Sequence, residues 1–284
     1  MTADRVKLAL FGLHRGSSVD ADTMVRRARL AEEAGFEALW VGDHIALPRG
    51  EGDAAEQPRL EALVALTYLA AVTTRVRLGV GVLVLPQRQP VLLAKQLTSI
   101  DVLSRGRLTV GIGVGYVEPE LRALGTTLAD RSARTDEFLA AMRCLWSEAE
   151  PAFSGRHVSF AGVVQRPLPA QRPHPPIVVG GHSPAAYRRA VRVANGWYGW
   201  QLDVEETRGT VVGLRETARR LERPPELGEL EITITPPGAV DVETALRYAD
   251  AGVHRLALQP QTMDGTAIDE LIAVVGDTLA GRLG

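Results

Sequence analysis

The sequence VRLGVGVLVLPQRQPVLLAKQLTSIDVLSRGRLTVGI, residues 76–112, decides the fold class. Residues 76–85 form an apolar run rich in valine and leucine, which indicates a buried strand. Residues 90–103 begin with proline and continue without glycine, as is typical of a helix. Residues 108–112 are again apolar. A strand, a helix and a strand in immediate succession predict a βαβ unit with parallel pairing.

The same alternation extends to both ends of the chain. Strands are expected at residues 6–12, 38–41, 177–179, 197–201, 230–235 and 253–258, and helices at 23–34, 60–73, 136–147, 184–193, 207–221, 242–251 and 268–279. With no break in composition, the pattern predicts one α/β domain over residues 1–284, a single (β/α)8 TIM barrel. A doubly wound parallel sheet is the alternative. The long connection at 131–171, with a hairpin at 153–160, predicts an excursion between strands four and five.

Composition restricts the classes of partner. The 284 residues carry 32 basic and 34 acidic side chains, a formal net charge of −2, so nothing favours nucleic acid or a membrane surface. Cys144 is the sole cysteine, which excludes an intrachain disulfide. The sequence shows neither an export signal nor a long apolar run. We therefore expect a cytoplasmic protein that acts on a small molecule.

The active site of such a barrel lies at the C-terminal ends of its strands. His14, His44 and His182 follow strands one, two and five directly, which places them on that face. In WVGDHIALP, residues 40–48, Asp43 precedes His44, and a carboxylate beside an imidazole could orient the ring or raise its basicity. The plainer alternative is that Asp43 caps the following turn and His44 lines a loop.

Glycines interrupt strand three and mark the ends of strands four and five. They are Gly79 and Gly81, then Gly111, Gly113 and Gly115, then Gly180 and Gly181. A backbone without side chains lets a planar ligand approach, and a helix start after His182 and Ser183 offers amide groups to a phosphate. Alternatively, these glycines only form tight turns between strands and helices.

Three aromatic residues lie close together near the end of strand six: Trp197, Tyr198 and Trp200. They could line a pocket for a planar or apolar substrate, although side chains on a strand alternate between faces and some must point outward. A metal site is not expected, because strand one is followed by a single histidine and neither HExxH nor a Cys/His ligand spacing occurs.

Three segments together resemble the bacterial luciferase-like monooxygenase superfamily, and specifically its deazaflavin-dependent oxidoreductase branch. They are AEEAGFEALWVGDHIALP (31–48), TTRVRLGVGVLVLPQRQPVLLAKQLTSIDVLSRGRLTVGIGVGY (73–116) and PHPPIVVGGHSPAAYRRAVRVANGWYGW (173–200). The resemblance implies a barrel that holds a flavin or the 8-hydroxy-5-deazaflavin coenzyme (coenzyme F-420) at its C-terminal face. It also implies a homodimer.

The resemblance assigns roles to particular residues. Asp43 and His44 match the pair beside the reactive ring, and Gly81-Val82 matches a non-prolyl cis peptide that supports it. Gly113, Val114 and Gly115 match the loop along the ribityl chain, and Gly180, Gly181, His182 and Ser183 match the phosphate cradle. Tyr116 stands where sugar-phosphate dehydrogenases of this branch have a proton-donating glutamate, with Glu118 two residues on. We therefore expect Asp43, His44 and Tyr116 to be catalytic, and His14, Trp197 and Trp200 to line the substrate pocket.

The expected function is hydride transfer between the deazaflavin coenzyme and a small organic substrate. The alternative is a two-component FMN-dependent monooxygenase, which would need a separate reductase to supply reduced flavin. A barrel that binds flavin without turnover is a further alternative, favoured by Tyr116 in place of the acid. The missing glutamate and the absence of a recognisable basic pocket argue against a sugar phosphate as substrate.

Overall fold

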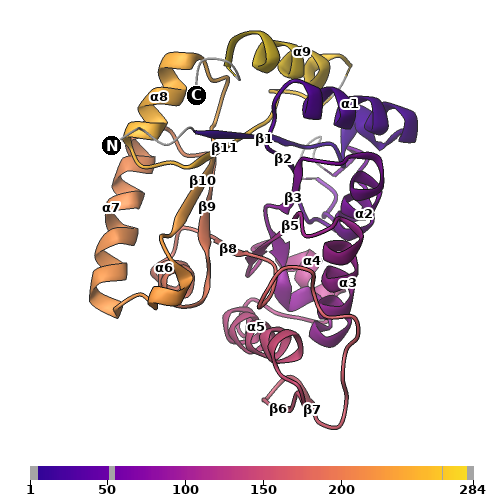
Figure 1. Ribbon diagram of the computed structural model, residues 1–284, viewed down its shortest axis with the longest axis vertical. Helices are drawn as coiled ribbons and strands as arrows, with labels where there is room; N and C mark the ends of the chain where they lie inside the picture. Colours follow the sequence, from indigo (N-terminus) through magenta and orange to yellow (C-terminus); the bar gives the residue numbers. More distant parts are fainter. Residues whose placement is uncertain (1–5, 51–54, 264, 280–284) are drawn as a thin grey trace.

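A computed structural model describes residues 6–50, 55–263 and 265–279. Its central feature is a closed barrel of parallel strands with helices around the outside (Figure 1). The barrel strands are β1 (Lys7–Phe11), β2 (Ala38–Val41), β3 (Arg77–Val80), β5 (Leu108–Gly113), β8 (Ile177–Gly180), β9 (Gly196–Trp200), β10 (Glu231–Thr235) and β11 (Arg255–Leu258). Pairing of β1 with β11 and of β3 with β5 closes the ring. The predicted (β/α)8 barrel is confirmed.

The helices follow the strands in the order that the sequence predicts. They are α1 (Ala21–Glu33), α2 (Ala62–Val72), α3 (Pro90–Leu103), α4 (Glu118–Ala123), α5 (Arg131–Ser147), α6 (Pro184–Val193), α7 (Val204–Leu221), α8 (Val242–Asp250) and α9 (Ala267–Val274). Helix α7 begins before its predicted start because Asp203 and Glu206 form a capping box. Helix α4 was not predicted, since it has only six residues and includes a proline. No helix within the described ranges is both long and apolar enough to cross a bilayer.

The excursion between β5 and β8 is present. It consists of α4, α5 and an antiparallel pair formed by β6 (Phe153–Ser154) and β7 (Ser159–Phe160). Figure 1 shows α5 and this pair projecting away from the barrel. The predicted hairpin at 153–160 is therefore confirmed, and the excursion leaves the order of the barrel strands undisturbed.

Aromatic side chains fill the inside of the barrel. Trp40 stacks on Tyr198 with a centroid separation of 5.4 Å, and both are buried with small residues of β1 and β11. A Cβ on Gly79 would lie 2.5 Å from the Trp40 indole, and one on Gly81 would lie 2.9 Å from it. Gly79 in β3 and Gly81 directly after it therefore make room for the Trp40 side chain inside the barrel.

Candidate functional site

A break in the third strand forms the floor of the candidate site. The peptide bond between Gly81 and Val82 is cis, as predicted, and separates β3 from β4 (Leu83–Val84). The Val82 side chain points into the barrel, because a Cβ built on Gly113 would lie 2.6 Å from Val82 Cγ2 and one on Gly180 would lie 2.9 Å from Val82 Cγ1. Val82 is partly exposed, whereas its neighbours Val80 and Leu83 are fully buried. The branched side chain therefore presents an open apolar surface at the barrel mouth.

Asp43 holds this segment in place. Its Oδ2 accepts a hydrogen bond from the Val84 amide at 2.9 Å, and its Oδ1 pairs with Arg88 Nη2 at 2.5 Å. Arg88 also pairs with Glu61 at 2.6 Å. The carboxylate is buried and fully engaged, and none of its hydrogen bonds goes to His44. The structure therefore assigns Asp43 to positioning β4 and Arg88, and it does not show the predicted contact with the imidazole.

Glu120, which was not among the predicted site residues, is the carboxylate that contacts His44. His44 Nδ1 lies 3.0 Å from Glu120 Oε2, while the amides of Ile45 and Ala46 donate to Oε1 at 2.5 and 3.1 Å. Burial alone would raise the pKa of Glu120, but the hydrogen bonds from His44 and the two amides outweigh it and lower that pKa. An ionised Glu120 accepts a hydrogen bond from Nδ1–H, which leaves Nε2 of the neutral ring with its lone pair. The signal in the sequence was the segment GYVEPE at 115–120, which carries two glutamates shortly after β5.

His14 is held neutral. Its ring is 2% exposed, and Nε2 accepts a hydrogen bond from the Gly42 amide at 3.1 Å. Burial first, and then the charges of Arg15 and Arg59, lower its pKa from 6.5 to about 3. The proton therefore resides on Nδ1, which has no hydrogen-bond partner among the described residues. The structure places this ring beside Phe11, at the mouth of the barrel.

The loop after β8 has the form of an anion cradle. Gly181 has φ +116°, Ser183 caps α6 by accepting a hydrogen bond from the Ala186 amide at 3.2 Å, and the side chains of His182 and Ser183 are exposed. On the facing loop Gly115 has φ +75°, and a Cβ there would lie 2.5 Å from Val84 Cγ1. Glycine is needed at these turns because their backbone conformations strain other residues. Amides at the start of α6 suit a phosphate.

The aromatic residues of β9 divide between two faces. Trp197 is fully buried, donates from Nε1 to the Gly181 carbonyl at 2.9 Å and packs against Tyr187 of α6. Its place as a pocket wall is therefore corrected: strand alternation turns it outward, where it supports the cradle from behind. Trp200 is 38% exposed, and its ring lies 5.3 Å from that of Phe11. Tyr116 is 76% exposed and approaches the His44 ring edge-on at 6.0 Å.

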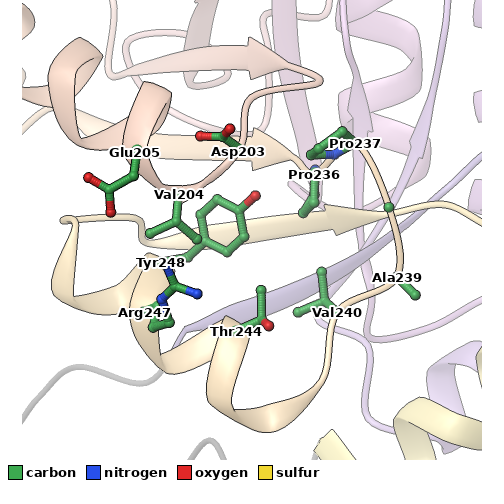
Figure 2. A pocket seen from close by; sticks show the side chains of 11 residues that line it. Asp203, Val204, Glu205, Pro236, Pro237, Ala239, Val240, Thr244, Arg247 and Tyr248 are labelled. Carbon is green, nitrogen blue, oxygen red and sulfur yellow. The ribbon is translucent and has the colours of Figure 1, made fainter.

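Two cavities adjoin the barrel mouth. One of about 340 Å³ lies between the start of α7 and the connection from β10 to α8, where Figure 2 shows Tyr248 between Val204 and Arg247. A second, of about 190 Å³, is lined by Gln201, Gln259 and their neighbours at the ends of β9, β10 and β11. The two share Pro236, Pro237 and Gly238. Neither cavity includes Val82 or His44, which form a separate open surface.

Comparison with known proteins establishes the family. The profile of the luciferase-like monooxygenases matches residues 7–274, and the chain belongs to this family of oxidoreductases and monooxygenases. It is 34% identical over 211 residues to an uncharacterized protein of Mycobacterium tuberculosis, covering 70% of this chain and 73% of that one. It is 31% identical over 214 residues to the FMNH(2)-dependent dimethylsulfone monooxygenase of Pseudomonas putida, covering 74% of this chain and 57% of that one.

Solved structures share the fold. A monooxygenase of Streptomyces bottropensis superposes with a TM-score of 0.75 at 24% identity, and each chain is covered to 98%. A secondary alcohol dehydrogenase dependent on coenzyme F-420, in complex with an adduct of that coenzyme and acetone, superposes with a TM-score of 0.79 at 16% identity, again with 98% of each chain covered. The neighbours thus include enzymes that use coenzyme F-420 and enzymes that use FMN.

Proposed function

We propose that this chain transfers hydride between the 8-hydroxy-5-deazaflavin coenzyme and a small organic substrate. When bound, the coenzyme supplies the carbon that accepts or donates the hydride. Val82 would support its ring system, residues Gly113, Val114 and Gly115 would follow its chain, and residues 180–183 would hold its phosphate. The fit is supported by the glycines around Val82, where added Cβ atoms would fill the space beside the floor.

The observation that carries this proposal is the hydrogen bond between His44 and Glu120. Oxidation of an alcohol removes hydride from carbon and a proton from the hydroxyl group, so a base must take the proton. With Nδ1 bonded to ionised Glu120, the Nε2 lone pair of His44 is available for that proton, and in the reverse direction the protonated ring returns it. This base and its orienting carboxylate suit proton-coupled hydride transfer. Asp43 acts through β4 and Arg88, and Tyr116 covers one edge of the imidazole.

FMN-dependent monooxygenation is a second candidate. It is favoured by the 31% identity to the dimethylsulfone monooxygenase and by a 31% identity over 173 residues to the oxygenase component of a flavin-dependent trigonelline monooxygenase of Acinetobacter baylyi. The chain spans 57% and 46% of these two proteins. Under this proposal a separate reductase would supply the reduced flavin.

Isotope transfer distinguishes the two. Enzyme loaded with oxidised coenzyme F-420 is incubated without oxygen with a panel of secondary alcohols deuterated at the carbinol carbon, and the recovered coenzyme is analysed by mass spectrometry. Hydride transfer delivers deuterium to the coenzyme. A requirement for dioxygen, with labelled oxygen appearing in the product and FMN as the active cofactor, would favour monooxygenation instead.

A homodimer is also proposed. The resemblance to the deazaflavin-dependent branch implies it, and the outer faces of α2 and α3 carry exposed apolar side chains, with Val64 64% and Leu92 58% exposed. Outer barrel helices commonly pack across a two-fold axis. Light scattering at micromolar concentration should give about twice the chain mass of 30.6 kDa; the mass of one chain would refute the dimer.

A further inference from the structure

Arg15 extends over the barrel mouth on the side opposite the anion cradle. Its guanidinium carbon lies 5.5 Å from the centre of the Phe11 ring, and Nη2 donates to Gln259 Oε1 at 2.8 Å. The Phe11 ring in turn contacts Trp200. Arg15 thus connects the end of β1 with the end of β11, and an aromatic surface lies beneath its charge.

The charge of Arg15 has no carboxylate partner within ion-pair distance in the part of the chain that the structure describes. Arg15 is partly buried, as is Arg88, which pairs with Asp43 at 2.5 Å. The buried arginines are paired as well: Arg27 with Asp269 at 2.7 Å, Arg189 with Asp136 at 2.5 Å and Arg255 with Glu37 at 3.0 Å. Arg15 Nε is buried and has no hydrogen-bond partner within the described ranges. Burial first, and then the charge of Arg59, lower the pKa of Arg15 to about 10. A guanidinium that is largely removed from water and has no carboxylate partner is suited to bind an anionic ligand.

His14 provides an independent sign of a ligand. Its Nδ1–H is buried in a ring that is 2% exposed, and it has no acceptor among residues 6–50, 55–263 and 265–279. The imidazole contacts the same Phe11 ring as Arg15, at a centroid distance of 5.9 Å. Two neighbouring residues therefore contribute unsatisfied donors around one aromatic side chain, and a buried donor without an acceptor is costly.

Space for the body of a ligand adjoins these donors. Gln259, which orients the guanidinium, also lines the cavity of about 190 Å³ together with Gln201. Gln201 has φ +54°, a conformation that non-glycine residues adopt at a cost and that concentrates at functional sites. A cavity of roughly 150 Å³ is enough for benzene, so one six-membered ring fits here.

We propose that Arg15, assisted by His14 and Gln259, binds the carboxylate of a small cyclic substrate whose ring occupies the adjoining cavity. This inference deepens the proposed function and rests on it for the identity of the reaction. A planar guanidinium binds a carboxylate through paired hydrogen bonds, which an uncharged isostere cannot accept equally well. In the order of the barrel strands, β11, β10 and β9 lie between β1, which precedes Arg15, and β8, which precedes the cradle, so one anion cannot be bound by both Arg15 and the cradle.

The test compares benzoate and cyclohexanecarboxylate with their primary amides by isothermal titration, on protein with and without bound coenzyme. Both carboxylates should bind the native protein more tightly than the amides. Arg15→Gln should weaken carboxylate binding by about 10- to 100-fold and leave amide binding unchanged. Arg15→Lys and Gln259→Leu should give intermediate losses, and the exposed Arg219→Gln should give none. Thermal unfolding of each variant checks that it is folded.

Three outcomes would overturn the proposal: no carboxylate of the series binds, the amides bind as tightly as the acids, or Arg15→Gln weakens coenzyme binding instead of carboxylate binding. The last would mean that Arg15 serves an anionic part of the coenzyme. Loss of carboxylate binding in Arg15→Gln, in a protein that binds neither coenzyme F-420 nor FMN, would support the subsite and refute the proposed function. A protein that binds the coenzyme but does not distinguish carboxylates from amides would keep the proposed function and refute the subsite.

Discussion

His44 and Glu120 are joined by a 3.0 Å hydrogen bond between Nδ1 and Oε2, although one follows β2 and the other lies on α4. Glu120 is 2% exposed and also accepts hydrogen bonds from the amides of Ile45 and Ala46, which follow His44 directly. The carboxylate therefore fixes both the ring and the loop that carries it. This arrangement sets the tautomer of His44 before any substrate arrives.

Glu120→Gln tests this role. The amide oxygen can still accept the two backbone hydrogen bonds, but the amide nitrogen would donate to His44 Nδ1 and move the ring proton to Nε2. We expect kcat for substrate oxidation to fall by ~10²–10⁴-fold, the range found when a base is lost or held in the wrong tautomer. Nitrogen-15 NMR of the histidines reads the tautomer directly. An unchanged tautomer with unchanged kcat would contradict the assignment.

His44→Ala separates chemistry from binding. Removing the imidazole should lower kcat by at least ~10²-fold, while the affinity for the coenzyme stays within a few-fold, because the cradle on β8 is untouched. His157→Ala, in the connection between β6 and β7, is the matched control and should retain full activity. Native-like turnover by His44→Ala would remove the histidine from the mechanism.

The contact between Gly180 and Val82 can be tested by a rescue experiment. A Cβ on residue 180 would lie 2.9 Å from Val82 Cγ1, so Gly180→Ala should displace the floor and weaken coenzyme binding by about tenfold. Val82→Ala in the same chain removes the clashing methyl groups and should restore part of the affinity. Gly209→Ala is the control, since nothing lies within 4 Å of its Cβ position. Additive losses in the double variant would show that the two sites are uncoupled.

The buried His14 predicts a pH dependence of stability. Its pKa falls from 6.5 in the unfolded chain to about 3 in the folded one, so below neutral pH the unfolded chain binds a proton that the folded chain does not. The free energy of unfolding should therefore decrease as the pH falls, by roughly 2 kcal/mol between pH 7 and about pH 5. His14→Gln can keep the acceptor for the Gly42 amide and should flatten this slope in urea titrations. A slope equal to that of the native protein would show that His14 is not held neutral.

The sequence predicted the barrel closely because its signals are local. Apolar runs mark each strand, and Pro90 and Pro184 mark helix starts that the structure reproduces. The cis peptide between Gly81 and Val82 was also predicted, through the resemblance to the deazaflavin-dependent branch.

Pairings between distant side chains were not predictable in the same way. Asp43 precedes His44 in sequence, yet its carboxylate turns toward Arg88, and the partner of His44 lies 76 residues further on, in a short helix without a periodic pattern. Arg15 and Gln259 are 244 residues apart and meet only because β1 and β11 are neighbours in the closed barrel. Trp197 was misplaced because a three-residue cluster does not reveal which side chains face the mouth.

The choice between coenzyme F-420 and FMN decides whether this barrel transfers hydride to a deazaflavin. Purified protein is titrated anaerobically with coenzyme F-420 and with FMN, in oxidised and reduced forms, and binding is followed by cofactor fluorescence with Gly180→Ala as the cradle control. We expect a dissociation constant for coenzyme F-420 in the micromolar range or below, at least about tenfold lower than for FMN, and weaker binding of coenzyme F-420 in Gly180→Ala. Micromolar binding of FMN without detectable binding of coenzyme F-420 would contradict it.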